Sequence, residues 1–428
     1  MSDIERLSRA GSIIIDKADI ISTNGTGLSV IDQIVQIDLY EDIFSPFVSG
    51  SIEIYESQDL LNFFPLIGEE VLNLEFHTPS VSKDFFSKYK FYIYKISEVA
   101  NPGDRSLLYT LHFVSIESIV NINTKISKAF SGKVSDIAKK ILTDKHGLNS
   151  SKSINVEYTK SSTKFVSNYW TPMKCIAYIT GNAVNSNGSA SYVFFENSKA
   201  LNFVSLESLY SADVSHSFFQ TNFIRDINAN TGDSAKDPIK DFAKIKQLTI
   251  PVGFDYLDRC SGGMYGSRLI TVDPVLKKYS SNTYTALGDF AKQKHLNANP
   301  VISRKAIARS DEALLYIPKH YGNFSGFTDV SNASTIQRRT SLLKQSEAFR
   351  INVTVFGRTD MTVGQKVYVE VPSKQPVARG DSKQLDNMSS GNFLIGAMHH
   401  KISRTKHEVD MELIKDSLLV DLNVGGHQ

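Results

Sequence analysis

The sequence predicts an α+β protein that is mainly antiparallel β, with two strand-rich regions on either side of a mixed segment. Short runs of alternating apolar and polar residues, separated by turn residues, occur in residues 1–117 and again in 346–428. Two stretches with helical periodicity lie between them, within residues 118–215. The chain also contains 25 Phe and 18 Tyr against a single Trp, and aromatic residues favour strands.

The first strands are predicted from the N-terminal region. In "QIVQIDLYEDI" the alternation places Val35, Ile37 and Leu39 on one face. A turn through Pro46 and Gly50 leads into the alternating run "SGSIEIYES". Short strands joined by turns without long helices indicate an antiparallel sheet that closes as a barrel or packs as a sandwich.

Three further strands complete this region. They are predicted in "GEEVLNLEFHT", "KYKFYIYKISEVA" and "RSLLYTLHFVSIES", and the turn "NPGD" joins the last two. The residues that share one apolar face are Leu72, Leu74 and Phe76 in the first of these strands and Tyr109, Leu111 and Phe113 in the last. We therefore assign residues 1–117 to one strand-rich domain.

Residues 118–215 change character and predict an α+β insert. "SDIAKKILTDKHGL" has the pattern of a helix that begins with Ser135 as its cap and ends near Gly147. "TPMKCIAYITGNAV" predicts a second helix with Pro172 in its first turn. The strands "SYVFFEN" and "KALNFVSLESLY" follow, with a hairpin turn over residues 196–200.

Strands return in residues 216–275 and 346–428, which predict a second strand-rich domain. In "TVGQKVYVEVPS" the residues Val367, Val369 and Val371 are in phase. "GNFLIGAMHHKIS" and "HEVDMELIKDSL" predict a closing hairpin of alternating strands.

Residues 276–345 predict an irregular and helical insertion into this second domain. Most of residues 280–330 is polar and rich in Asn and Ser, which indicates loops with one or two small strands. "NASTIQRRTSLLKQSEAF" predicts a helix with Ser334 or Thr335 near its cap.

Charge and cysteine content exclude several classes of protein. The 428 residues include 47 basic and 45 acidic side chains, a net charge of +2, whereas a dedicated nucleic-acid binder usually has a concentrated basic face. Cys175 and Cys260 predict buried thiols in a reducing compartment. The charged N-terminus is unlike a signal peptide, and no apolar run reaches the length of a membrane span.

No pattern of residues predicts catalysis, a cofactor or a metal. The sequence lacks GxSxG, HExxH and Walker motifs. Among the histidines, His399, His400 and His407 cluster, but neighbours on a strand face opposite sides, so ordinary strand histidines are the better interpretation. Glu69 and Glu70 begin a strand, and nothing places them in a shared cleft. We predict that the chain is not an enzyme.

Two basic segments are candidates for contacts. Arg338 and Arg339, with Lys344, could form a basic stripe on the late helix, either as a solvated face or as a contact between subunits. The polar loop 373–390, with Lys374, Arg379 and Lys383, either contacts a partner or is simply an exposed loop.

Taken in order, these segments resemble the baseplate hub proteins of contractile-tailed bacteriophages. The resemblance is carried by "LYEDIFSPFVSGSIEIYES", "LIGEEVLNLEF", "YWTPMKCIAYITGNA", "SYVFFENSKALNFVSLESLY", "VGQKVYVEVPS" and the final hairpin, and it spans about Ile13 to Leu419. Such hubs are related to the hub of the T-even phages and to the N-terminal part of VgrG-type spikes.

The resemblance implies a homotrimer in which each chain supplies two tube-like β-barrel domains, decorated by an α+β domain. Six barrels would then form a ring that joins a central spike to the tail tube, in contact with tube-initiator, tape-measure and baseplate wedge proteins. Such a ring belongs to the virion, assembles in the host cytoplasm and lets DNA pass without binding it, which suits a near-neutral chain. No β-helix or lysozyme-like region follows the second barrel, so we expect the spike to be a separate protein.

On this interpretation, Phe44 and Phe47 beside the Pro46 turn either contact the neighbouring ring or plug the end of the barrel. Three other functions stay open: a tail-associated cell-wall hydrolase, a glycan- or receptor-binding tail protein, and the hub of a phage-like injection particle. The first would need a carboxylate or metal cleft, and the second would favour exposed aromatic platforms with a β-helical repeat.

Overall fold

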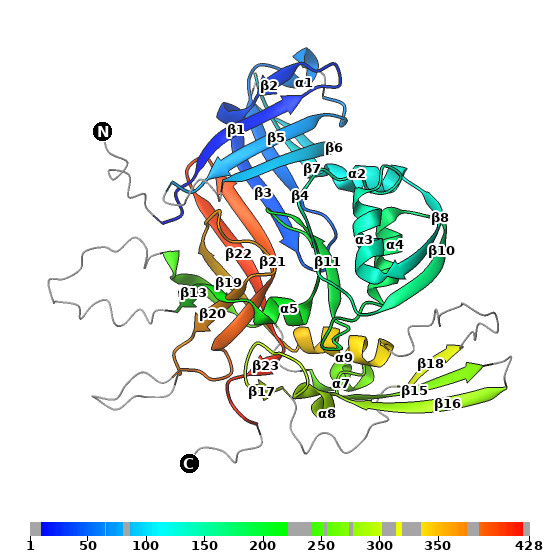
Figure 1. The fold of residues 1–428 in the computed structure, drawn as a ribbon. Helices are drawn as coiled ribbons and strands as arrows, with labels where there is room; N and C mark the ends of the chain where they lie inside the picture. Colours follow the sequence, from blue (N-terminus) through cyan, green and yellow to red (C-terminus); the bar gives the residue numbers. More distant parts are fainter. Residues whose placement is uncertain are drawn as a thin grey trace, which may run out of the picture.

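The computed structural model describes residues 10–64, 66–79, 86–103, 105–220, 242–251, 255–273, 277–301, 314–318, 335–374 and 385–422. In these residues the fold is mainly antiparallel β with some helices, as predicted (Figure 1). The described strands form one curled sheet of 13 strands and four small sheets.

The strands of the large sheet come from both ends of the sequence. They are β1 (Ile14–Ile21), β2 (Gly27–Ser29), β3 (Ile34–Asp42), β4 (Ser49–Glu56), β5 (Val71–His77), β6 (Ser87–Gly103), β7 (Ser106–Ser115), β13 (Val214–Phe219), β14 (Ile245–Thr249), β19 (Phe349–Phe356), β20 (Lys366–Glu370), β21 (Gly391–Ser403) and β22 (His407–Lys415).

In Figure 1 the small sheets and most helices lie beside and below the large sheet, whereas α1 lies at the top near β2. The small sheets are β8 (Ile126–Lys133) with β10 (Ser162–Trp170); β9 (Ile154–Val156), β12 (Leu201–Ser205) and β11 (Tyr192–Glu196); β16 (Lys278–Thr285), β15 (Gly266–Asp273) and β18 (Leu314–Pro318); and β17 (Asn299–Pro300) with β23 (Ser417–Leu418). The helices are α1 (Leu60–Phe63), α2 (Ile116–Asn123), α3 (Val134–Thr143), α4 (Pro172–Thr180), α5 (Leu206–Ser211), α7 (Tyr256–Ser261), α8 (Ala286–Phe290), α9 (Ile336–Ser346) and the 3₁₀ turn Ile31–Gln33.

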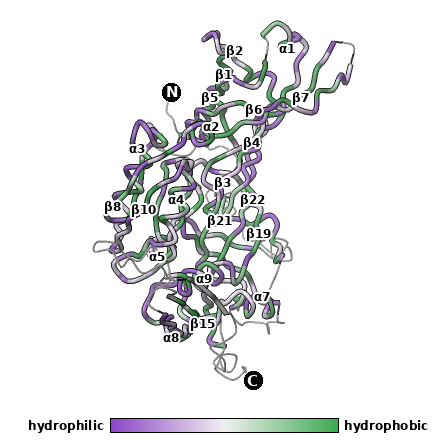
Figure 2. Tube along the Cα trace, turned by 90° about the vertical axis from the view of Figure 1, so that its right-hand side faces the viewer, coloured by the Kyte–Doolittle hydropathy of each residue, from purple (hydrophilic) through white to green (hydrophobic). Residues whose placement is uncertain are grey.

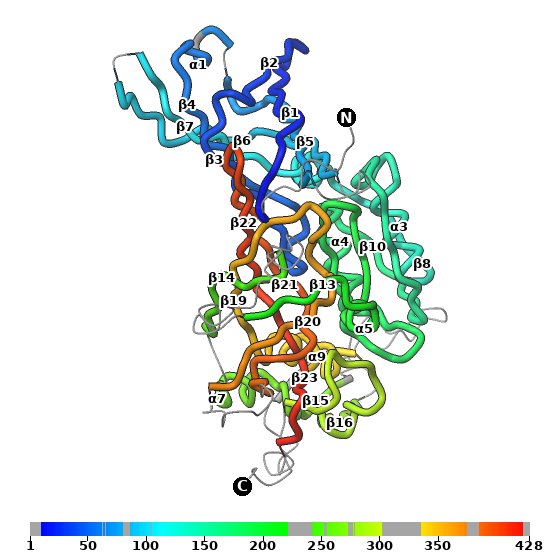
Figure 3. The backbone as a smooth tube through the Cα atoms, turned by 90° about the vertical axis from the view of Figure 1, so that its left-hand side faces the viewer, coloured from blue at the N-terminus to red at the C-terminus, as the bar shows by residue number. Residues whose placement is uncertain are grey.

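The two strand-rich regions are parts of one sheet. Its order is β14-β19-β22-β21-β3-β4-β7-β6-β5-β1-β2, and β20 with β13 branches from β21. The regions join where β3 pairs with β21, for example Asp38 opposite Lys401 (Figures 1 and 3). The long hairpin of β21 and β22 therefore extends from the C-terminal region into the N-terminal one.

The sheet curls back on itself in both regions. At one end, Ser12 forms a bridge with Lys406, next to the turn between β21 and β22. In the C-terminal region, Phe219 at the end of β13 bridges to Lys244 just before β14. Each curl encloses its own apolar core, which we call the N-terminal core, around Ile37, and the C-terminal core.

Hydropathy changes from residue to residue along many strands (Figure 2), and this alternation explains which face of each strand is buried. Ile37 and Leu39 are buried as predicted, and the same is true of the predicted apolar faces of β5, β7 and β20. The prediction for Val35 is wrong, because the β3–β4 register shifts between Ile34 and Gln36. This irregularity buries Ile34 and leaves Val35 42% exposed.

The insert has a third core, the insert core, between α3, α4 and the small sheets. α4 begins as predicted, with Pro172 in its first turn and the Thr171 hydroxyl accepting from the Lys174 N–H. The predicted cap of α3 is wrong, because the N-cap is Lys133 and Ser135 is buried inside the first turn. The hairpin over residues 196–200 is confirmed by the pairing of β11 with β12.

The region around α9 is more regular than the sequence indicates. β16 pairs with β15 along its whole length, which exceeds the small strands that we expected there. α9 begins after Thr335, one of the two predicted caps, although the Thr335 hydroxyl donates to the Gly181 carbonyl instead of capping the helix. Ser334 lies outside the described residues.

Cys175 is buried and Cys260 is half-buried, and both are free thiols. Within the described residues, none of the helices has the length and apolar character needed to cross a membrane.

Candidate functional site

The most extended functional candidate is the side of the large sheet that faces away from the cores. Side chains there alternate with the buried ones, because successive residues of a strand point to opposite faces. We call this surface the polar face. It consists of Asp38, Tyr40, Asp42, Asn352, Thr354, His399, Lys401, Asp410 and Glu412, all half-buried or exposed.

Hydrogen bonds and ring stacking between neighbouring strands hold the side chains of the polar face in place. His399 Nε2 lies 2.7 Å from Asp38 Oδ1, and its ring stacks on Tyr40 with 4.4 Å between centroids. Lys401 Nζ and the Thr354 hydroxyl both donate to Asp410, at 2.5 and 2.6 Å. Partial burial raises the pKa of Asp410, but these hydrogen bonds and the Lys401 charge outweigh it and lower that pKa.

The polar face is hollowed. A concavity of about 480 Å³ lies over β3, β14, β19, β21 and β22, and Asp42, Asp410 and Glu412 are among its lining residues. Its described lining includes no lysine or arginine.

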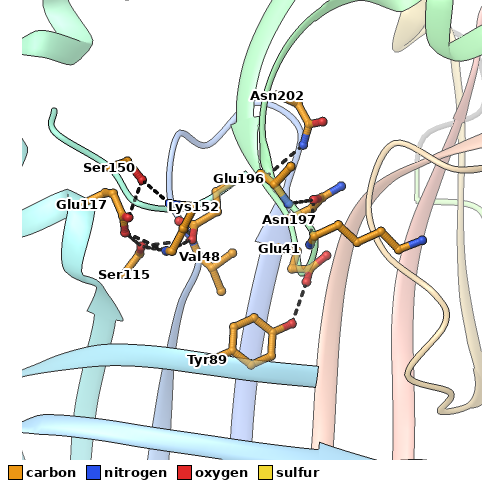
Figure 4. A network of polar contacts seen from close by, with 12 residues as sticks. Glu41, Val48, Tyr89, Ser115, Glu117, Ser150, Lys152, Glu196, Asn197 and Asn202 are labelled. Atoms are coloured by element: carbon orange, nitrogen blue, oxygen red, sulfur yellow. Dashed lines mark hydrogen bonds and ion pairs between the residues drawn. The ribbon is translucent and has the colours of Figure 1, made fainter. Parts of the chain in front are cut away.

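A buried polar network holds the insert against the sheet (Figure 4). Lys152 Nζ pairs with Glu196 and lies 2.7 Å from Glu117 Oε2, while the Ser115 hydroxyl donates to both carboxylates. Glu196 also accepts from the N–H of Val48, the residue just before β4. The network thus joins β4 and β7 to the insert.

Burial affects the two carboxylates of this network differently. It raises the pKa of Glu196, and Lys152 offsets only part of that effect. At Glu117 burial acts in the same direction, but the charge and hydrogen bond of Lys152, with the hydroxyls of Ser115 and Ser150, lower the pKa overall. We take the pair as sharing one lysine charge, so neither carboxylate is independent of Lys152.

A second buried carboxylate joins the two strand-rich regions. Glu41 on β3 accepts from the Thr362 hydroxyl at 2.6 Å and from the Val363 N–H at 3.2 Å. It also accepts from the Tyr89 hydroxyl at 3.2 Å (Figure 4). Burial raises its pKa, although these donors oppose that effect. Sequence reasoning missed Glu41, Lys152 and Glu196, because their partners are far away in the sequence.

The four predicted contact residues lie in different surroundings. Phe44 is 44% exposed at the β3–β4 turn, whereas Phe47 is buried in the insert core. Arg338 pairs with Asp289, and Arg339 donates to the carbonyls of Ala190 and Tyr192. A contact of these residues with another chain stays a prediction, and for Phe47 the ring is already packed within its own chain.

The histidine cluster is split as the strand geometry predicts. His399 lies on the polar face, while His400 and His407 are buried on the core side and lie 3.0 Å apart. In the described part of the chain, no group of three or more metal-binding side chains comes together. Glu70 accepts from the N–H groups of Ile67 and Gly68 and shapes the turn before β5.

The predicted contact loop is described only in part. Lys374 is exposed at its start, and Arg379 and Lys383 lie outside the described residues.

Two solved structures share this fold along nearly the whole chain. The tail protein from Neisseria meningitidis MC58 is 12% identical, covers 95% of this chain and 97% of its own, and superimposes with a TM-score of 0.55. The 43 kDa tail protein of prophage MuSo2 from Shewanella oneidensis is 8% identical, with 94% and 98% covered and a TM-score of 0.53. No family model and no curated protein matches the sequence. The chain therefore has the fold of these two tail proteins, and the resemblance expected from its sequence is confirmed at the level of the fold.

Proposed function

We propose that this chain is the structural hub of a contractile-tail baseplate, with no catalytic role. The observation that carries the proposal is the fold shared with two tail proteins over 95% and 94% of the chain. Because the likeness covers each of those proteins almost completely, it concerns the whole architecture rather than one common motif.

The chain would act as a homotrimer. Residues 1–117 would form one tube-like barrel, and residues 216–275 with 346–428 the other, so that six barrels surround a channel. The insert, 118–215, and the insertion, 276–345, would lie at the periphery. The curls of the sheet at Ser12–Lys406 and Phe219–Lys244 support a barrel-like path for each half.

In this ring the polar face would line the channel. It is concave and continuous across the β3–β21 junction of the two halves, as the wall of a channel requires. Its carboxylates would keep DNA moving through the virion tail without retention. The ring would hold a central spike on one side and meet the tail tube, tape-measure and wedge proteins on others.

The molar mass in solution tests the proposal. We would measure it by light scattering after size exclusion, for the chain alone and mixed with the spike protein of the same particle. A mass of three chains, or a complex of three chains with the spike, is the expected result. A chain that stays monomeric in both samples would contradict the hub assignment.

A further inference from the structure

An apolar groove lies where the insert meets the β3–β4 turn. Its volume is about 360 Å³. Phe44 comes from the turn, Met173 and Ile176 from α4, and Val193 and Phe194 from β11. Phe44 leaves 44% of its surface exposed here, and together with its apolar neighbours in the groove it forms a contiguous apolar surface of the kind that marks interaction sites.

One cation lines this apolar groove. Arg339, on α9, is the charged residue among its lining residues. Its Nη1 donates to the carbonyls of Ala190 and Tyr192, at 3.1 and 2.7 Å. In the described residues no carboxylate pairs with Arg339, and its Nε and Nη2 have no acceptor.

The charge of Arg339 is therefore balanced only by backbone dipoles. Burial lowers the pKa of its guanidinium from 12.5 to about 10, which still leaves it protonated at neutral pH. Arg339 is half-buried, and withdrawing a cation from water is costly unless an anion accompanies it. A guanidinium can hold a carboxylate through two parallel hydrogen bonds, so its free donors fit that anion.

The neighbouring Arg338 shows the alternative within the same helix. Its Nε lies 2.6 Å from Asp289 Oδ2, and its Nη1 donates to the Gly188 carbonyl at 2.7 Å. Arg338 thus has its carboxylate inside the chain. The two adjacent arginines differ in this one respect, which makes Arg338 a natural control.

We propose that the groove binds a segment of a partner protein that places a carboxylate beside an apolar side chain. The carboxylate would pair with Arg339, and the apolar side chain would cover Phe44 and the α4 wall. Charge complementarity selects this occupant, because a purely apolar segment would seal the guanidinium away from water without a counter-ion. The inference does not depend on the hub role.

Two small probes test the charge requirement. We would titrate the protein, labelled at its methionine methyl groups, with 3-phenylpropionate and with the neutral 3-phenylpropionamide, and follow Met173 by NMR. The acid is expected to bind about tenfold more tightly than the amide, as one charge-assisted pair allows. In Arg339→Gln that preference should vanish, and in Arg338→Gln it should persist. Equal affinities of the two probes for the wild type would overturn the proposal.

A second variant tests the same groove independently, in case Arg339→Gln does not fold. Ala177 is an exposed residue of α4 that lines the groove, so Ala177→Phe should fill the groove without disturbing the core. It is expected to lose binding of both probes while its thermal unfolding matches the wild type. Unchanged probe binding in a folded Ala177→Phe would show that the probes bind elsewhere and would overturn the proposal.

Selection of random 12-residue peptides then tests the nature of the occupant. Peptides selected on the wild type and counter-selected on Ala177→Phe should be enriched in Asp or Glu next to Leu, Ile or Phe. Enrichment without acidic residues would contradict the proposal. If Ala177→Phe instead changes the oligomeric mass of the chain alone, the occupant is a second copy, and a different partner protein is ruled out.

Discussion

At the scale of single residues, the buried pair of histidines is the least conventional feature of the sheet. His400 Nδ1 and His407 Nε2 are 3.0 Å apart, so one ring donates to the other. The outer nitrogens, His400 Nε2 and His407 Nδ1, are buried and have no hydrogen-bond partner among the described residues. Leaving a buried polar atom unpaired costs about 1–3 kcal/mol, and the pair therefore opposes rather than supports the stability of the core.

Burial also sets how the pair responds to acid. It lowers the pKa of His400 from 6.5 to about 4 and that of His407 well below its usual value, and a charge on the neighbouring histidine acts in the same direction. Between pH 6.5 and about 4 the two histidines become protonated in the unfolded chain but stay neutral in the folded chain. The free energy of unfolding therefore falls as the pH falls through this window, and is unaffected by these groups above it.

The prediction is a loss of stability on mild acidification. From pH 7 to pH 5, each imidazole should reduce the free energy of unfolding by roughly 2 kcal/mol. Urea unfolding at both pH values measures it, and His400→Phe/His407→Phe should remove most of this dependence. His146→Asn, which changes an exposed histidine, should leave the dependence intact. An equal acid response in the double variant would contradict the assignment to this pair.

At the scale of elements, close approach of strands decides where a side chain fits. Gly50 on β4 lies opposite Leu39 on one side and Phe113 on the other. A Cβ atom there would come within 2.2 Å of the Asp38 carbonyl oxygen and 2.6 Å of the Phe113 ring. The carbonyl belongs to the paired backbone of β3, so it cannot move without disturbing the junction of the sheet.

We therefore expect Gly50→Ala to destabilise the protein by about 2 kcal/mol or more, as overpacking of a core does. The matched control is Gly27→Ala on β2, where a Cβ would meet nothing within 4 Å. That variant should stay within about 0.5 kcal/mol of the wild type. Chemical denaturation of both variants checks the difference, and equal effects would mean that the junction tolerates a wider spacing.

The buried face of a strand was predicted correctly from the sequence where one alternating pattern runs through the whole strand. The in-phase valines of β20 and the alternation in β5 and β7 are local patterns, and the structure buries the faces they predict. The face on which Val35 lies was predicted wrongly, because a bulge shifts the alternation within β3 and no glycine or proline marks that bulge in the sequence. Ser135 has a hydroxyl that could cap a helix, but α3 begins two residues earlier than predicted, with Lys133 at its N-cap.

At the scale of the whole molecule, the sequence indicated two strand-rich regions but not their union. Pairing of β3 with β21 joins residues more than 350 positions apart, and no local pattern encodes such a partner. The buried polar networks also join residues that are far apart in the sequence. Glu41 accepts a hydrogen bond from Thr362, and Glu196 accepts one from Val48. The alternation within each strand indicates which residues lie on the polar face, but it does not indicate that this face is concave.

Lys152 should be essential for holding the insert against the sheet. Lys152→Met leaves two buried carboxylates facing each other, and we expect a loss of about 2–3 kcal/mol, less than for a sealed ion pair because Lys152 is 30% exposed. Urea unfolding measures the loss. It should shrink at low pH, where the carboxylates become protonated.

The control for that variant is Lys128→Met, which removes a surface pair with Asp144 and should cost much less stability than Lys152→Met. Hydrogen exchange locates the effect, which is expected at Ser115, Val48 and the neighbouring strands. A change confined to the surface of the insert would argue against a role of Lys152 in joining the parts.

The most direct test of the proposed hub is a cryo-electron microscopy map of the chain bound to the spike protein of its particle. The account predicts a threefold ring in which the polar face, including Asp38, His399 and Asp410, lines the central channel. A map in which this face points outward, or in which the chain forms no threefold ring, would contradict it.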